Sequence, residues 1–319
     1  MSIDVSVCIA NWNCCNMLRD CLQSLLRQPQ GARLEVVVVD NASTDDAVAM
    51  VEREFPDVIL IRNAENRGFA KASNQAAAAS SGRFLFFLNN DTIVSPMALH
   101  GLLDYARRHP DAAMMGPRLR DSNGAFQISY RRRPTVSALL HRTAILRWTG
   151  AFGSIYRRYR RGGYNPHHRG QVDLLMGAAV FVSREVFFAC GRWDEDFAFG
   201  GEDLELAARI GERYAVHFVP DVEVTHHGRV SSRLNVGFST ESVAIGYVQY
   251  LRKTGTSTAG LLFYKLAVTV DAPLQLLTTG SQYLGRRIAG RREKAGKSLL
   301  AFRGSMHFLG RSLPKFWRA

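Results

Sequence analysis

Residues 35–45 read EVVVVDNASTD, and this order of residue types sets the architecture that the rest of the chain follows. Four consecutive valines without polar alternation indicate a parallel β-strand that is buried on both faces. The polar run that begins at Asp40 places hydrogen-bonding side chains at the carboxyl end of that strand. Ligands of open parallel sheets bind at this edge. The stretch therefore predicts a buried sheet and the edge where its ligand lies.

Similar segments lie on both sides of this stretch. Short apolar runs that predict buried strands occur at residues 5–9, 58–61, 84–88 and 174–183. Helical spacing of apolar residues fills the intervals at residues 18–26, 70–80 and 97–108, the last of them preceded by Ser95-Pro96 as N-cap and first helical residue. Strands that alternate with helices predict an α/β fold with a mostly parallel sheet and helices on both faces.

Polar residues follow the other predicted strands as well. Asn11 and Asn13 come after the first strand, and Asn89-Asn90-Asp91 comes after residues 84–88. No G-x-G-x-x-G follows a strand and no G-x-x-x-x-G-K-[ST] occurs, which removes the main support for a dinucleotide or P-loop site.

Charge is unevenly spread over the 319 residues, which include 41 Lys and Arg against 28 Asp and Glu. Residues 118–170 carry net +11, residues 231–319 carry net +11, and the remainder carries net −9. We therefore expect an acidic core domain over 1–235, with a basic insertion at about 118–170, and a basic helical region over 236–319.

The cysteines and the N-terminus favour a cytoplasmic location. Five cysteines form no zinc-like pair or disulfide framework, which suits a reducing compartment. The first residues, MSIDVSVCIANWN, lack a basic segment followed by an apolar run, so no signal peptide is predicted.

Six segments together resemble the family 2 inverting glycosyltransferases, and in particular their rhamnosyltransferase-like branch. In chain order they are VSVCIANWN, EVVVVDNASTD, NRGFAKASNQA, FLFFLNNDT, GRWDEDFAFGGEDLEL and VTHHG, within residues 4–231. The resemblance implies a GT-A fold, a Rossmann-like sheet that binds a nucleotide-diphosphate sugar and a divalent cation, Mg²⁺ or Mn²⁺.

The resemblance also implies donor and metal residues. Asp40 with Asn11 matches the slot for the uracil or thymine base, and Arg67, Gly68 and Asn90 match donor-binding positions. The alternative is a plain turn, or a helix N-cap in which Asp40 or Ser43 caps a helix over 47–54, and this reading and the donor-binding one can hold together.

Asp91 matches the metal carboxylate of the family's DXD motif. The sequence departs from that motif at Asn89, where one anionic ligand is lost. His226, or else its neighbour His227, matches a second metal ligand. The alternative for these residues is an Asx turn at Asp91 and surface histidines in a turn.

The acceptor side of the site is implied by GRWDEDFAFGGEDLEL. Asp203 matches the general base that removes the acceptor's hydroxyl proton. Glu202 beside it is expected to bind acceptor or orient the site, and a pair of helix-dipole carboxylates is the alternative. Trp193, Asp194 and Glu195 are expected to shape the acceptor pocket, against a core-packing role for the Trp193 ring.

The basic C-terminal region, helical from residue 240, predicts contact with a membrane surface. Its end, KSLLAFRGSMHFLGRSLPKFWRA, suits a helix in the interface of an anionic membrane. Residues 257–284 are interrupted by Lys265, Asp271 and Pro273, too often for a spanning helix. Helices that pack on the core with a solvated basic face are the alternative, and nucleic-acid binding is not supported by any recognition motif.

Together these features predict a peripheral enzyme on the cytoplasmic face of the inner membrane. It would transfer a sugar, L-rhamnose from dTDP-rhamnose, with inversion to a polyprenyl-diphosphate-linked saccharide for a bacterial surface polysaccharide such as O-antigen. The basic clusters at 131–133 or 157–161 would meet the lipid diphosphate. A UDP-hexose donor, or a non-catalytic nucleotide-sugar-binding protein, is the alternative.

Overall fold

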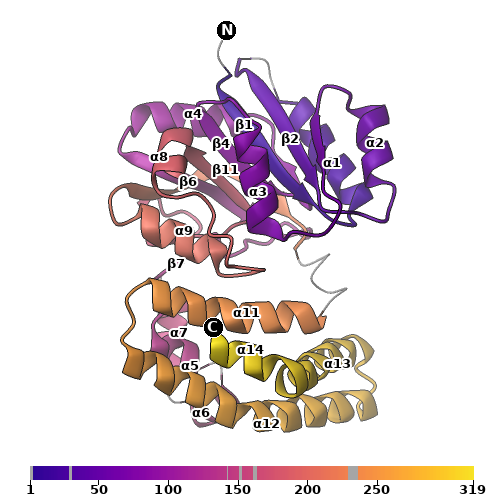
Figure 1. Cartoon of the computed structure of the whole chain (residues 1–319), viewed down its shortest axis with the longest axis vertical. Helices are drawn as coiled ribbons and strands as arrows, with labels where there is room; N and C mark the ends of the chain where they lie inside the picture. The colour runs from indigo at the N-terminus through magenta and orange to yellow at the C-terminus, as the bar shows by residue number, and fades with distance from the viewer. Residues whose placement is uncertain (1–2, 29–30, 142, 151–152, 161–163, 229–235) are drawn as a thin grey trace. The chain divides into compact units, whose positions relative to one another are not determined.

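The computed structural model describes residues 3–28, 31–141, 143–150, 153–160, 164–228 and 236–319 (Figure 1). The chain forms two compact units. The first comprises residues 1–133, 163–198 and 202–231, and the second comprises 134–162, 199–201 and 232–319. Part of the predicted basic insertion, residues 134–162, thus belongs to the helical unit, and the predicted boundary at residue 235 lies outside the described residues.

The first unit is built on a large sheet in the order β3-β2-β1-β4-β10-β6-β11-β5, with β8 paired to β11. Its strands are β1 Val5–Asn11, β2 Leu34–Asp40, β3 Ile59–Arg62, β4 Phe84–Asn89, β5 Thr92–Val94, β6 Ala112–Arg120, β8 Gly170–Gln171, β10 Ala179–Ser183 and β11 Ala215–His226. A small second sheet pairs β7 Tyr130–Arg131 with β9 Leu174–Leu175. Strands β1 to β4 are parallel, whereas β10 and β5 are antiparallel to their neighbours.

Helices cover both faces of this sheet (Figure 1). They are α1 Cys15–Leu26, α2 Ala47–Glu54, α3 Phe69–Ala78, α4 Ala98–Arg108, α8 Arg184–Ala189 and α9 Glu202–Ile210. In β2, Val36 and Val38 pack in one core with side chains of α1, α2 and α4. The alternate residues Val37 and Val39 are also buried, on the face covered by α3. The unbroken valine run is therefore explained by burial on both faces, and the α/β expectation is confirmed.

Two local expectations are wrong. Helix α4 begins at Ala98 after Met97, which has a φ of 66°, so Ser95-Pro96 is not its cap; Ser95 Oγ donates to Glu223 O instead. The predicted strand over 174–183 is two strands, β9 and β10, separated at Gly177.

The second unit is helical. Its elements are α5 Val136–Leu140, α6 Ala144–Thr149, α7 Gly153–Arg160, α11 Val236–Lys253, α12 Thr258–Ile288, α13 Arg292–His307, the π-helical turn Phe308–Ser312 and α14 Leu313–Arg318. Helix α12 contacts α5, α6, α11, α13 and α14. It runs through Lys265, Asp271 and Pro273 without a break, so the predicted interruption is wrong.

Candidate active site

The sheet brings the carboxyl ends of three parallel strands together. Asn11 ends β1 and is paired in register with Asp40, which ends β2. On the other side of β1, Ala10 is paired with Asn89, which ends β4. Three of the polar segments found in the sequence therefore meet at one edge, as the parallel arrangement predicts.

Asp40 is held within its own loop. Its Oδ1 accepts hydrogen bonds from Ser43 Oγ at 2.6 Å and from Asn11 Nδ2 at 3.0 Å, and its Oδ2 accepts from the Ser43 N–H at 2.9 Å. Helix α2 has Asp46 at its N-cap, so the expectation that Asp40 or Ser43 caps it is wrong, whereas the turn at Asp40 is present. The side chain closes a turn at the strand end and is fixed there.

Asn90 and Asn11 extend this network across the edge. Asn90 Nδ2 donates to Asn11 Oδ1 at 2.8 Å, and Asn11 in turn donates to Asp40. All three side chains are buried. Buried and mutually hydrogen-bonded side chains keep one geometry, so the loops after β1, β2 and β4 form a connected surface.

Gly68, directly before α3, has a φ of 81°, which disfavours side chains. A Cβ there would also lie 3.2 Å from Ala198 O. Its carbonyl accepts from Asn41 Nδ2 at 3.2 Å, which ties this loop to the residue after Asp40. Arg67 beside it is exposed at the same loop.

Asp91 faces His226 rather than His227. His226 Nε2 lies 3.4 Å from Asp91 Oδ1 and 3.3 Å from Asn89 Nδ2. His226 Nδ1 contacts Gln127 Oε1 at 3.0 Å, whereas His227 Nδ1 is paired with Ser122 Oγ. Burial acts to raise the pKa of Asp91, but the hydrogen bond and charge of His226 outweigh it and hold the pKa below its usual range.

Asp91 and His226 suit a hard cation that is also bound by ligands from outside the protein. Within the described residues no group of three or more His, Cys, Asp and Glu could enclose a metal ion. Asp91 and His226 offer one carboxylate and one imidazole, and Gln127 orients the imidazole from behind. Mg²⁺ and Mn²⁺ commonly take few protein ligands and complete their shell with phosphate oxygens and water, so the pair fits such an ion.

Asp203 lies in the first turn of α9, and its side chain accepts a hydrogen bond from the segment between β9 and β10. Its Oδ2 accepts from the Gly177 N–H at 2.9 Å, and its Oδ1 accepts from the Leu204 N–H at 2.9 Å. A Cβ at Gly177 would lie 2.9 Å from Asp203 Cβ, so this approach requires glycine. Burial raises the pKa of Asp203, and the two backbone donors and Arg131 oppose that shift only in part.

The segment between β9 and β10 also links Asp203 to the sheet edge that carries Asp91. Ala178 O accepts from the Asn89 N–H at 3.0 Å, immediately after the Gly177 contact with Asp203. Asn89 leads directly to Asn90, which is bonded to Asn11 and through it to Asp40. Asp40, Asp91 and Asp203 thus belong to one continuous set of hydrogen-bonded loops. Glu202 beside Asp203 is buried.

The WDED loop is tied to α3. Asn74 Nδ2 donates to Trp193 O and to Glu195 Oε1, both at 2.9 Å, and Asn74 Oδ1 accepts from the Trp193 N–H. The Trp193 ring is only 1% exposed and packs edge-on against Phe69, Phe87 and Phe187. The expectation that its ring shapes the acceptor pocket by stacking on sugar is therefore wrong in this structure, because other rings surround it. Asp194 is half-buried and Glu195 is exposed on the same loop.

Sequence reasoning missed three supporting positions. Gln127 orients His226, Gly177 makes room for Asp203, and the charge of Arg131 acts on the Asp203 carboxylate. The glycine inside an apolar run was the one available signal, since such a glycine commonly marks a break or a close approach. Gln127 carries no pattern that a single sequence reveals, and Arg131 was singled out only as part of the basic cluster 131–133, not for its action on Asp203.

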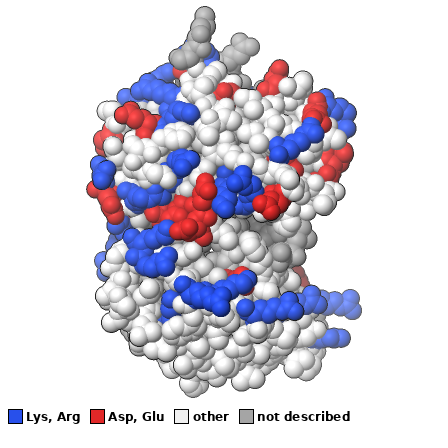
Figure 2. All heavy atoms as spheres, viewed as in Figure 1, with Lys and Arg blue, Asp and Glu red and all other residues white. Residues whose placement is uncertain are grey.

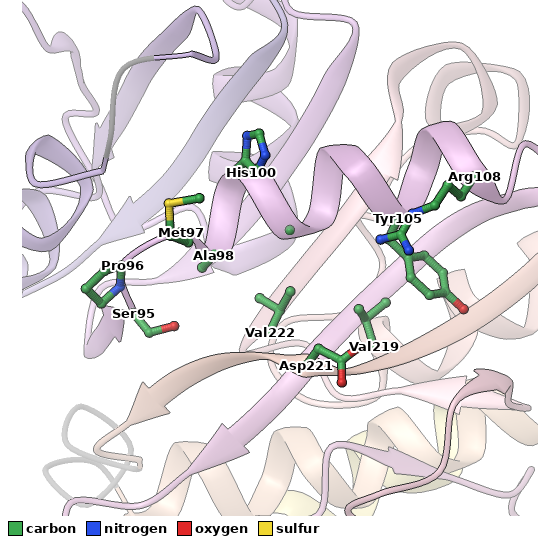
Figure 3. Close-up of a pocket in the computed structure, with 11 residues that line it drawn as sticks. Ser95, Pro96, Met97, Ala98, His100, Tyr105, Arg108, Val219, Asp221 and Val222 are labelled. Atoms are coloured by element: carbon green, nitrogen blue, oxygen red, sulfur yellow. The ribbon is translucent and has the colours of Figure 1, made fainter.

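A separate cavity of about 250 Å³ lies between the start of α4 and β11 (Figure 3). Met97, just before α4, and His100 of α4 line it on one side, and Val219, Asp221 and Val222 line it from β11. It shares no residue with the loops that hold Asp40, Asp91 and Asp203.

Comparison with known proteins identifies the family of the chain. The family model described as glycosyl transferase family 2 matches residues 6–173, more than half of the chain. N-acetylglucosaminyl-diphospho-decaprenol L-rhamnosyltransferase of Mycobacterium tuberculosis is 29% identical over 214 residues, 61% of this chain and 66% of that protein. O-antigen biosynthesis protein RfbC of Myxococcus xanthus is 28% identical over 228 residues, 68% of this chain and 17% of that protein. The chain thus spans less than two thirds of the length of these relatives.

Solved structures show the same fold at low identity. GalNAc-T7 with UDP, GalNAc and Mn²⁺ has a TM-score of 0.58 at 20% identity, covering 79% of this chain and 48% of the other. Mannosyltransferase PcManGT from Pyrobaculum calidifontis has a TM-score of 0.56 at 17% identity, covering 100% and 88%. The chain therefore belongs to glycosyl transferase family 2 and has the GT-A fold.

Proposed function

We propose that this chain transfers a sugar, with inversion, from a nucleoside-diphosphate donor to a saccharide carried on a polyprenyl diphosphate. The donor we favour is dTDP-L-rhamnose, and the product would serve a bacterial surface polysaccharide. The observation that carries the proposal is the hydrogen-bonded set of loops that contains Asp40, Asp91 and Asp203. The name of the similar mycobacterial protein supports the choice of sugar and acceptor, and that of the myxobacterial protein supports a role in surface polysaccharide synthesis.

The donor side uses the edge formed by β1, β2 and β4. Asp40 and Asn11 would accept and donate hydrogen bonds to the pyrimidine ring, at the fixed turn after β2. Arg67, Gly68 and Asn90 would lie under the sugar and diphosphate. Asp91 and His226 would hold Mg²⁺ or Mn²⁺, whose positive charge stabilises the negative charge that develops on the departing diphosphate.

The acceptor side uses Asp203 as general base. Asp203 takes the proton of the attacking hydroxyl while that oxygen forms its bond to the anomeric carbon on the face opposite the diphosphate. The bond from the anomeric carbon to the phosphate oxygen breaks, and the nucleoside diphosphate leaves with the electron pair. A raised pKa makes Asp203 a stronger base than an ordinary aspartate, which suits this step. Glu202, Asp194 and Glu195 would bind hydroxyl groups of the acceptor.

Two experiments test this function. Thermal shift with a panel of nucleotide sugars and Mn²⁺ identifies the donor, because a ligand at 100 times its dissociation constant stabilises by about 2.7 kcal/mol. We expect dTDP-rhamnose to give the largest shift and a UDP-hexose a smaller one; the reverse order would establish the alternative donor. Mass spectrometry of a GlcNAc-diphosphate lipid incubated with that donor should then show one added deoxyhexose. Donor binding without turnover of any acceptor or donor would identify a non-catalytic binding protein.

The acceptor also suggests the location. A polyprenyl carrier is confined to a bilayer, so we place the enzyme peripherally on the cytoplasmic face of the inner membrane. The basic cluster at residues 131–133, or the one at 157–161, would meet the carrier's diphosphate; residue 161 lies outside the described part of the chain.

A further inference from the structure

Helix α12 turns a continuous apolar stripe outward. Its members recur at intervals of three, four or seven residues, which places them within one narrow face of a helix. Their exposed fractions are Phe263 60%, Leu266 48%, Val270 65%, Leu277 68%, Leu284 57% and Ile288 87%. Surface helices normally direct such a stripe into the core, so an exposed stripe along a 31-residue helix needs a partner.

Lys265 and Asp271, the charged residues of α12 before its last turn, are turned away from this stripe and are buried. Lys265 is buried and its Nζ donates to Trp317 O at 3.0 Å. Asp271 is buried and accepts from the N–H groups of Ala144 and Ile145, at 2.8 and 3.1 Å, at the start of α6. The outer face of α12 therefore keeps no charge between Phe263 and Leu284, although the sequence alone shows two charges in this interval.

Short helix α6 adds further exposed apolar surface. The two bonds to Asp271 hold it against α12. Ile145 is 42% exposed and Trp148 is 89% exposed on this helix. A tryptophan left almost fully in solvent is costly, and tryptophan is enriched at membrane–water interfaces.

The second unit also carries the positive charge of the protein. It contains 20 Lys and Arg against 3 Asp and Glu, net +17, whereas the first unit is net −4. Exposed cations gather where α12 ends and α13 begins, at Arg287, Arg291, Arg292 and Lys294. Figure 2 shows a white surface over α12 with a row of blue Lys and Arg beside it on the same unit. An apolar band beside cations fits an anionic bilayer.

We infer that the outer face of α12, with Ile145 and Trp148 of α6, is the surface that enters an anionic bilayer. The helix lies in the plane of the interface. By length and composition α12 could also cross a membrane. Crossing would place Lys265 and Asp271 in hydrocarbon and separate them from Trp317 and α6, whereas lying flat keeps these contacts. The inference rests on the membrane attachment proposed above and assigns it to a surface other than the C-terminal segment.

The C-terminal segment is less suited to this role than its sequence indicates. Phe308 and Phe316 are buried and pack edge to face at 5.4 Å. Trp317 Nε1 donates to Thr269 Oγ1 of α12. The aromatic residues that predicted an interfacial helix at 297–319 thus hold the second unit together.

Flotation of the full-length protein with vesicles tests the assignment. The probe is phosphatidylcholine vesicles with and without 30% phosphatidylglycerol (about one anionic lipid in three, the order at which cations contribute). Val270→Gln with Leu277→Gln removes two outward side chains of α12. Leu26→Gln with Ile59→Gln, two exposed apolar residues of the first unit, is the matched control.

We expect the α12 variant to lose at least about tenfold in binding to anionic vesicles, as the buried apolar area of two side chains predicts. The control should float like the unmodified chain, and both variants should keep their thermal shift with donor. Equal flotation of the α12 variant overturns the inference. The inference is also overturned if the unmodified chain is a dimer and the α12 variant is a monomer that floats equally well. A second copy of the chain would then be the partner of α12.

The outcome is separable from that of the proposed function. A chain that transfers no sugar but floats through α12 contradicts only the proposed function. A chain that transfers sugar to a water-soluble acceptor but floats independently of α12 contradicts only this assignment.

Discussion

Asp203 combines burial with nearby positive charge, and this combination controls when it is a base. Because burial raises its pKa, a larger fraction is protonated at low pH than for an ordinary aspartate. Only the ionised form accepts a proton, so activity should be lost as pH falls through the raised pKa. The acidic limb of kcat/KM against pH is therefore expected at a higher pH than the ordinary pKa of aspartate would give.

The charge of Arg131 favours the ionised form of Asp203. Arg131→Gln should move the acidic limb to higher pH, because one favourable charge is removed. Arg132→Gln is the control. Arg132 is next to Arg131 in the sequence, but it is exposed and is not among the groups acting on Asp203. A limb that does not move in Arg131→Gln would contradict this electrostatic role.

Substitutions at Gln127 and Ser122 test whether His226 or His227 is the metal ligand. Gln127→Ala removes the contact that orients His226 and should weaken Mn²⁺ affinity about 10- to 100-fold. Ser122→Ala removes the matching contact of His227 and should leave the affinity unchanged. Titration of Mn²⁺ in the presence of dTDP measures both; a loss confined to Ser122→Ala would make His227 the ligand.

At the scale of residues, the motif positions could be predicted from the sequence, but the side chains that contact them in the fold could not. The six motifs predicted Asp40, Asp91 and Asp203, which the fold connects through Asn11, Asn89 and Ala178. The burial of Trp193 depends on three rings from distant segments, and the pairing of His226 with Gln127 spans 99 residues. Contacts of this kind arise only when the chain is folded.

At the scale of elements, the parallel strands were the most predictable part. An unbroken apolar run such as 36–39 needs burial on both faces, and few arrangements provide it. Element ends were less predictable. β9 and β10 are separated where the Gly177 N–H bonds Asp203, and α4 starts after Ser95 has been drawn to Glu223, both of which are tertiary contacts.

Helix α12 shows why charge in a sequence does not always interrupt a helix. Asp271 accepts from two N–H groups at the start of α6, where a carboxylate is favoured by the helix dipole. Pro273 is tolerated because the neighbouring helices hold α12 on both sides of it. The sequence showed three interruptions, whereas in the fold two of them, Lys265 and Asp271, form hydrogen bonds with other helices.

Asp271 should therefore stabilise the second unit. Asp271→Ala leaves the buried N–H of Ala144 and the partly buried N–H of Ile145 without this acceptor and is expected to cost about 1–3 kcal/mol in unfolding free energy. Glu293→Ala removes only an exposed ion pair with Lys297 and should leave stability unchanged. Urea unfolding of both variants measures the difference; equal stability of the two would contradict the capping role.

At the scale of the molecule, the two units differ in charge as well as in fold. The glycosyltransferase unit is net −4 and the helical unit is net +17, so the global excess of Lys and Arg describes only one of them. The sequence located two basic stretches, at 118–170 and 231–319. It did not show that much of both belongs to one helical unit, because that requires contacts between segments about 100 residues apart.

This charge predicts salt-dependent membrane binding. Raising NaCl from about 50 to 500 mM should weaken binding to anionic vesicles, because screening shortens the range of surface charges. Arg287→Gln, Arg291→Gln and Arg292→Gln together should reduce binding at low salt by about 1 kcal/mol per cation and flatten the salt dependence. Binding that is indifferent to both salt and these substitutions would show that charge is not involved.

The central claim is that Asp40, Asp91 and Asp203 serve one reaction, with Asp203 as the base. Transfer of rhamnose to a GlcNAc-diphosphate lipid should be measured with Asp203→Asn, alongside dTDP-rhamnose affinity on the same sample. We predict a rate lower by about 10²- to 10⁴-fold with donor affinity unchanged. A rate within a few fold of the unmodified enzyme would contradict the account.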